Sequence, residues 1–120
     1  MTAVLWVAAG GAAGSVLRYL VSDSLNRRDG PWGTILVNLV GSLALGVVIG
    51  WYAERGADSL VRVALGVGVL GGFTTFSAWT VETIDLLDRS RLVPGLLNLA
   101  LPIVGGLLAA AAGLAIGRWL

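Results

Sequence analysis

The heptapeptide Gly71-Gly72-Phe73-Thr74-Thr75-Phe76-Ser77 interrupts a long apolar segment, residues 60–87. That segment is long enough to cross a bilayer as a helix. Paired glycines followed by three hydroxyl side chains within four residues are unfavourable for a continuous helix. Non-helical backbone at membrane depth is tolerated only where it is buried in protein or lines a wet cavity. We therefore predict a broken helix whose freed polar groups can meet a cation or an anion. The alternative is an unbroken helix in which the hydroxyls bond carbonyls one turn earlier.

Three further apolar segments, residues 3–21, 33–53 and 93–116, meet the same length requirement. The composition agrees, since 57% of the 120 residues are hydrophobic and 12% are charged, whereas about a quarter are charged in soluble domains. The connections are short, so consecutive helices run antiparallel. We predict an all-α integral membrane protein that forms one four-helix domain over residues 1–120. A membrane span is favoured over a cleaved signal for the first segment, because no basic residue precedes it.

Several function classes are not supported by the residues present. The sequence contains no cysteine and no histidine, and all eight basic residues are arginine. The usual transition-metal ligands and the common neutral-pH base are therefore missing. We find no nucleophile–base pair and no phosphate-binding loop, so an enzyme is not predicted. There is also no basic stripe to bind nucleic acid.

Each predicted span contains one pair of glycines four residues apart. Such pairs let helix backbones approach closely in lipid. They favour tight packing and self-association of this small bundle. The pairs are Gly10/Gly14, Gly46/Gly50, Gly68/Gly72 and Gly113/Gly117.

The arginines other than Arg18 are almost evenly divided between the two sides of the membrane. One side has Arg27, Arg28, Arg89 and Arg91, and the other has Arg55, Arg62, Arg118 and the terminal amine. Arginine asymmetry normally sets the orientation of a membrane protein. A chain with so little bias can insert both ways and form an antiparallel dimer, or another factor sets a single orientation.

Three polar side chains within the spans are functional candidates. Arg18 either extends to the lipid headgroups or places a positive charge at a pore mouth, where it would favour anions. Asn38 either bonds a neighbouring helix or donates its NH2 to a passing anion. Glu82, with Asp85 and Asp88, follows the break at three-residue spacing. The two aspartates belong to an emerging helix end, whereas Glu82 is close enough to the break to lie inside.

Together these residues resemble the CrcB, or Fluc, family of fluoride channels. The first span reads Gly10-Gly11-Ala12-Ala13-Gly14-Ser15-Val16-Leu17-Arg18-Tyr19, similar to the family's GGxxGxxxRY. The second reads Gly33-Thr34-Ile35-Leu36-Val37-Asn38-Leu39-Val40-Gly41-Ser42, similar to GTxxVNxxGS. The interrupted stretch of the third is similar to GGxTTFS. Three motifs in this order cover nearly the whole chain and make the resemblance specific.

The resemblance implies a dual-topology dimer of antiparallel subunits in the bacterial cytoplasmic membrane, with two narrow fluoride pores. It implies passive efflux of fluoride, which lowers fluoride toxicity. It also implies a sodium ion at the dimer interface, held by the backbone carbonyls of Gly71 and Thr74. The pore would be lined by Asn38, Thr75, Phe76, Ser77, Trp79 and Glu82, with Arg18 in the vestibule. The ring edge of Phe76 would face fluoride, since an aromatic edge carries the positive end of the quadrupole.

Two departures from the family pattern concern the pore wall. The family usually has a second phenylalanine where this chain has Trp79, whose indole is larger but has a positive edge and an N–H donor. The family's fourth span usually carries pore hydroxyls, but residues 96–119 contain none, and Asn98 is their only polar uncharged side chain. Pro102 removes a helical hydrogen bond there and is expected to expose a carbonyl. The chain would therefore be either a homodimer with altered conductance or one subunit of a heterodimer with a paired homologue.

Two other functions fit a four-span membrane protein. A small multidrug exporter needs a membrane-embedded carboxylate for proton exchange. Glu82 lies too close to a helix end to fit that role well. A non-transporting scaffold would use the glycines for assembly alone.

Overall fold

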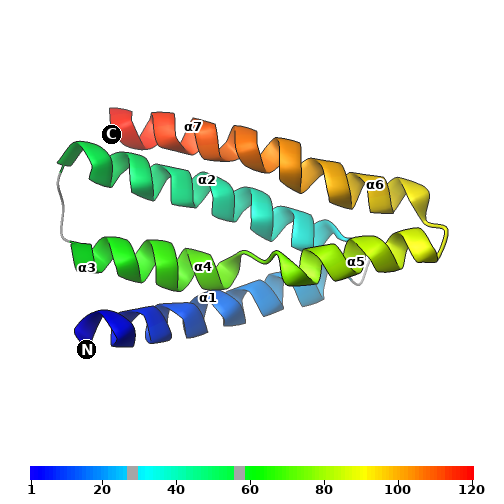
Figure 1. Ribbon diagram of the computed structural model, residues 1–120, viewed down its shortest axis with the longest axis horizontal. Helices are drawn as coiled ribbons and strands as arrows, with labels where there is room; N and C mark the ends of the chain where they lie inside the picture. Colours follow the sequence, from blue (N-terminus) through cyan, green and yellow to red (C-terminus); the bar gives the residue numbers. More distant parts are fainter. Residues whose placement is uncertain (27–29, 56–58) are drawn as a thin grey trace.

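The computed structural model describes residues 1–26, 30–55 and 59–120, and its described part consists of helices joined by short non-helical stretches. Arg27 and Arg28, which are counted in the arginine balance between the two membrane sides, lie outside the described residues. Figure 1 shows the long helices side by side, with the two chain ends at the same end of the bundle. The bundle measures 49 × 30 × 19 Å along its principal axes. The predicted all-helical architecture with four apolar helices is confirmed.

The first two long helices are continuous. Helix α1 is Thr2–Asn26 and α2 is Trp32–Arg55. The polar turn from Ser22 to Asn26 thus extends α1 beyond the predicted range of residues 3–21. The stretches that are long and apolar enough to cross a membrane are Thr2–Asn26, Trp32–Ala53, Leu60–Asp88 and Leu92–Trp119.

The third long helix is broken where the sequence predicts it. It consists of α3 (Ser59–Arg62), the π-helical segment η1 (Val63–Leu70), α4 (Gly71–Phe73) and α5 (Ser77–Asp88). Thr74 is extended, with φ −79° and ψ 159°. The Thr74 hydroxyl also donates to the Leu70 carbonyl oxygen at 3.1 Å. The back-bonding considered as the alternative therefore occurs at Thr74, but it does not keep the helix continuous.

The fourth long helix changes its winding at Pro102. It consists of α6 (Leu92–Ala100), the π-helical segment η2 (Leu101–Gly105) and α7 (Gly106–Trp119). Proline has no N–H to donate to the carbonyl four residues earlier, and its ring crowds that carbonyl. A π-helical turn is one of the recognised responses to such a disturbance.

The glycine pairs lie where two helices of the same chain pack closely. A Cβ on Gly46 would lie 2.5 Å from the Ala110 carbonyl oxygen of α7, and one on Gly10 would lie 2.8 Å from the Ala64 carbonyl oxygen of η1. The α2–α7 contact is the most extensive in the bundle, followed by that of α1 with η1. The close backbone approach predicted from these pairs is confirmed. Because they are occupied inside the subunit, the glycine pairs give no support to self-association.

Most large apolar side chains of the bundle face outward. Val4, Leu5, Val16 and Leu107 are each more than half exposed, while the small buried core includes Val37 and Phe73. A helix that is apolar all round is suited to lipid or to a protein partner rather than to water. This surface agrees with a multi-pass membrane protein.

Candidate functional site

The break in the third helix is held open by one side chain from α2. The Asn38 side-chain Nδ2 donates to the Thr75 carbonyl oxygen at 3.1 Å, and the Thr75 backbone N–H donates to Asn38 Oδ1 at 2.9 Å. The amide thus pairs with both backbone groups of Thr75, a non-helical, half-buried residue. An unpaired backbone group in that environment is costly, so Asn38 stabilises the interrupted conformation.

Two backbone carbonyls near the break are left without their regular helical hydrogen-bond donors. In a continuous helix the Thr75 N–H would bond the Gly71 carbonyl, but here it bonds Asn38. The Ala78 N–H would bond the Thr74 carbonyl, but it donates to Thr75 Oγ1 at 3.3 Å instead. The carbonyls of Gly71 and Thr74 therefore lose their regular helical donors. Gly71 is exposed on the subunit surface and Thr74 is half-buried.

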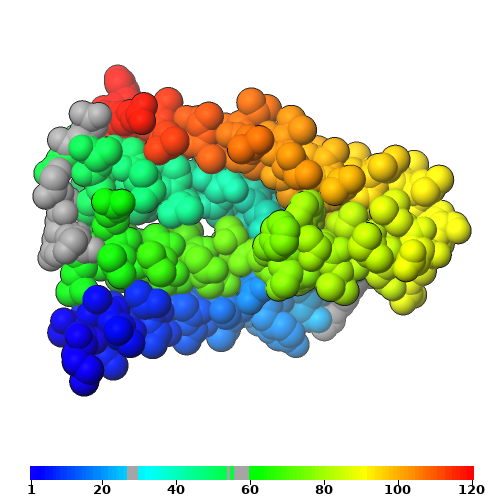
Figure 2. Space-filling view, viewed as in Figure 1, coloured from blue at the N-terminus to red at the C-terminus, as the bar shows by residue number. Residues whose placement is uncertain are grey.

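A cavity of about 620 Å³ lies between the break, α2 and the fourth helix. We call it the aromatic cavity. Its polar and aromatic lining comes from Asn38, Ser42, Thr74, Thr75, Phe76 and Trp79. Figure 2 shows the surface hollowed between α2 and the third helix in this region. Four predicted pore residues, Asn38, Thr75, Phe76 and Trp79, thus meet around one space.

The two aromatic rings of this cavity are held differently. Their centroids are 5.4 Å apart with an interplanar angle of 56°. Phe76 is 74% exposed and points out of the subunit. Trp79 is half-buried, and its indole N–H donates to the Asn98 carbonyl oxygen. Pro102 has no N–H to donate to this carbonyl, and Trp79 supplies it with a donor from another helix.

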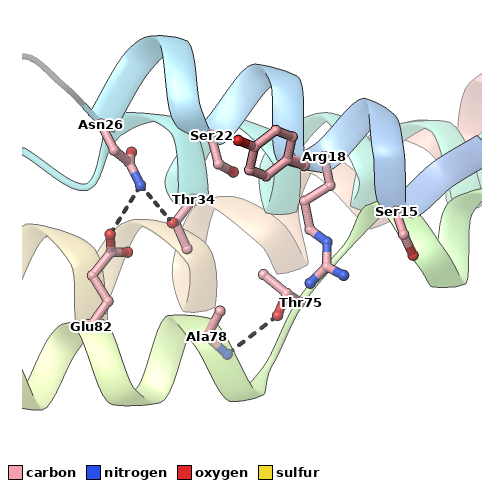
Figure 3. A pocket seen from close by; sticks show the side chains of 9 residues that line it. Ser15, Arg18, Ser22, Asn26, Thr34, Thr75, Ala78 and Glu82 are labelled. Atoms are coloured by element: carbon pink, nitrogen blue, oxygen red, sulfur yellow. Dashed lines mark hydrogen bonds between the residues drawn. The ribbon is translucent and has the colours of Figure 1, made fainter.

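A second cavity of about 320 Å³ lies on the other side of Thr75, between α1 and α5. We call it the Arg18 cavity. Its polar lining includes Ser15, Arg18, Ser22, Thr34, Thr75 and Glu82. Figure 3 shows the Arg18 guanidinium directed toward Thr75 and away from Glu82. Arg18 is half-buried, so its charge faces a partly enclosed space at the break.

Glu82 is held by amides from two other helices. Asn26 Nδ2 donates to Glu82 Oε1 at 3.1 Å, and Asn98 Nδ2 lies 3.4 Å from Glu82 Oε2. The Asn26 Oδ1 also accepts the Gly33 N–H at 2.7 Å, which caps the first turn of α2. Figure 3 shows the Asn26–Glu82 bond across the end of the Arg18 cavity. The carboxylate is therefore an organised part of the cavity wall.

Two predicted residues lie apart from these cavities. Ser77 is exposed and belongs to the lining of neither cavity. Gly71 is one turn before the break and lines neither of them. Its predicted role depends on its carbonyl and on a surface that faces away from the subunit.

Residues of the first and last helices complete the site but were not predicted for it. Asn26 lies beyond the predicted first span, residues 3–21, because the apolar pattern ends several residues earlier. Asn98 is fully buried and donates to Thr83 Oγ1 at 3.0 Å, while its Oδ1 has no partner in the described part of the chain. Its position as the only uncharged polar side chain of an apolar span was the one available signal.

Comparison with known proteins gives matches along nearly the whole chain. The family model described as CrcB-like protein, Camphor Resistance (CrcB), matches residues 5–114. A protein of Novosphingobium aromaticivorans named fluoride-specific ion channel FluC is 44% identical and aligns over 98% of each chain. The protein of the same name from Allorhizobium ampelinum is 45% identical over 100% of this chain and 99% of its own. A third, from a Caulobacter species, is 44% identical over 98% and 96% of the two chains.

Proposed function

The chain belongs to the CrcB family, and from that premise we propose that it is a fluoride-selective channel. It carries fluoride passively out of the cytoplasm and so lowers fluoride toxicity. Its place is the bacterial cytoplasmic membrane, which four apolar helices can span. The observation that carries the proposal is the Asn38–Thr75 pairing, because it holds polar backbone open between two cavities.

The chemistry of the two cavities suits a small, strongly hydrated anion. Such an ion enters a narrow pore only if several donors replace its water. Asn38 has two N–H donors, and the Thr75 carbonyl takes one, so one remains for the anion. The Thr75 hydroxyl lies beside both cavities. Phe76 offers a ring edge with partial positive charge, and Arg18 supplies the positive potential that favours anions at the entrance.

A sodium ion fits the backbone around the break. The Gly71 and Thr74 carbonyls lose their helical donors to the bonds made by Asn38 and Thr75, and such oxygens are suitable ligands for a hard cation. The two carbonyls of one subunit are too few to coordinate it alone. Two copies of the pair, one from each subunit, would hold the ion at the dimer interface. There it would supply a fixed positive charge.

The working unit is an antiparallel dimer. Phe76 is 74% exposed and Gly71 is exposed, so a partner subunit would cover both. The near balance of arginines between the two sides favours insertion in both orientations. A heterodimer with a paired homologue is the second possibility, because the fourth helix lacks pore hydroxyls.

Growth protection distinguishes the channel from its two rivals. We expect the chain to restore growth on fluoride medium to a bacterium that lacks its own fluoride channels. It should not protect the same cells against cationic drugs. Drug resistance that Glu82→Gln abolishes, without fluoride protection, would establish a multidrug exporter instead. No protection of either kind from a chain that accumulates in the membrane would favour a scaffold.

A further inference from the structure

Pro102 and Trp79 both affect the hydrogen bonding of one carbonyl, that of Asn98. In an α-helix the N–H of residue 102 would bond the carbonyl of Asn98, but proline has no N–H. The Trp79 indole N–H, which comes from α5, donates to that same oxygen. The third helix therefore supplies this carbonyl with a donor that Pro102 cannot provide.

The bond lies within a small set of contacts that join α5 to α6. The Thr83 hydroxyl donates to the Trp79 carbonyl oxygen at 2.8 Å, and Asn98 Nδ2 donates to Thr83 Oγ1 at 3.0 Å. Asn98 is fully buried. The Trp79 ring is therefore bonded to the Asn98 backbone. The Trp79 backbone is bonded to Thr83, which in turn accepts a hydrogen bond from the Asn98 side chain. Such an arrangement leaves the indole little freedom to rotate.

We propose that Pro102 is a positioning residue for ion passage: it frees the Asn98 carbonyl, which fixes the Trp79 ring in the wall of the aromatic cavity. The part of this proposal that concerns ion passage rests on the proposed function. A phenylalanine at position 79 has no N–H and could not be fixed in this way. A neighbouring helix thus sets the orientation of the ring at position 79, and Pro102 acts only through that ring.

The indole resonance tests the bond without any transport. The chain has five tryptophans, so the purified, ¹⁵N-tryptophan-labelled protein should give five indole N–H signals, and Trp79→Phe identifies the one from Trp79. Pro102→Ala supplies a backbone N–H that competes for the Asn98 carbonyl. We expect the Trp79 signal to move upfield and to exchange with solvent about five-fold faster, the factor for one lost hydrogen bond of ordinary strength.

Pro94→Ala is the matched control, because Pro94 lies in the first turn of α6, where an N–H has no helical acceptor. It should leave the Trp79 signal unchanged. A Trp79 signal that is the same in Pro102→Ala as in the parent chain would overturn the proposal, as would an equal shift in Pro94→Ala.

Fluoride efflux from liposomes then tests whether Pro102 acts through Trp79. We expect Pro102→Ala to change the efflux rate about five-fold in the parent chain, but by less than about two-fold in the Trp79→Phe background. Equal effects of Pro102→Ala in both backgrounds would contradict the coupling. If the parent chain carries no fluoride, the proposed function fails, while the indole measurement still decides whether the bond exists.

Discussion

At the scale of single residues, side-chain amides take the place of missing backbone hydrogen-bond partners. Asn38 pairs with both backbone groups of Thr75, and Asn26 pairs with Glu82 and with the start of α2. In each case the amide supplies an N–H donor and a carbonyl acceptor on separate atoms, so that one side chain can pair with two different groups. The backbone N–H and carbonyl of Thr75 are therefore both paired within the protein.

Asn38→Leu provides the test at this scale, because leucine has a similar volume and no polar atoms. Two backbone groups of Thr75 lose their partners, and each unpaired buried group costs about 1–3 kcal/mol. We expect a lower melting temperature in detergent and fluoride efflux that falls about ten-fold or more. Leu36→Ala, on an exposed position of α2, should have little effect on either.

Asn38→Asp separates the structural role of Asn38 from its electrostatic role. A carboxylate can still accept the Thr75 N–H, so this variant should be more stable than Asn38→Leu. Its negative charge should nevertheless repel fluoride and reduce efflux at least as strongly. Efflux at the parent rate from either variant would show that Asn38 does not contribute to the path.

At the scale of helices, the glycines determine which pairs of helices touch. A Cβ on Gly14 would meet the Val69 carbonyl oxygen and would lie 2.9 Å from the Phe73 nitrogen, whereas one on Gly11 would have its nearest neighbour, the Gly68 oxygen, at 3.9 Å. Backbone atoms cannot move aside as a flexible side chain can. The contact between α1 and the third helix thus depends on Gly14 and tolerates a methyl group at Gly11.

Gly14→Ala and Gly11→Ala form a matched pair on one helix. Overpacking of a tight contact costs about 1–3 kcal/mol, so Gly14→Ala should lower the unfolding temperature and push α1 away from the break. Gly11→Ala should unfold close to the parent temperature. Thermal unfolding in detergent measures both, and equal stability of the two variants would show that the close approach is not needed.

The helices were more predictable from the sequence than the contacts between them. Length and apolarity predict the four spans, and Gly71-Gly72 with three following hydroxyls predicts the break, because these effects are local. The pairing of α2 with α7 was not predictable, since every span has a glycine pair and nothing local says which two meet. The Trp79–Asn98 bond could not be predicted for the same reason, although Pro102 did indicate which helix would offer a free carbonyl.

At the scale of the whole molecule, one side of the bundle leaves groups of the break uncovered. The aromatic cavity is open to the outside at Phe76, and the freed carbonyl of Gly71 lies on an exposed surface. A second copy in the opposite orientation would cover both features. The small difference in arginine number between the two sides permits this arrangement without a second gene.

Orientation variants test the antiparallel dimer. Removing Arg62 and Arg118 together leaves more arginine on the other side, and removing Arg89 and Arg91 does the reverse, so each double variant should insert in one direction. Each alone should protect cells poorly against fluoride, and the two expressed together should restore protection. Full protection by each variant alone, with a single orientation verified by tag accessibility, would rule out the antiparallel arrangement.

Fluoride efflux from liposomes that contain only this purified chain is the most direct measurement of the central claim. We predict that a fluoride electrode will record rapid release after dilution, once an ionophore relieves the charge imbalance, while chloride loaded into the same vesicles is retained. Fluoride retained as in protein-free vesicles, or chloride released as quickly as fluoride, would contradict the account.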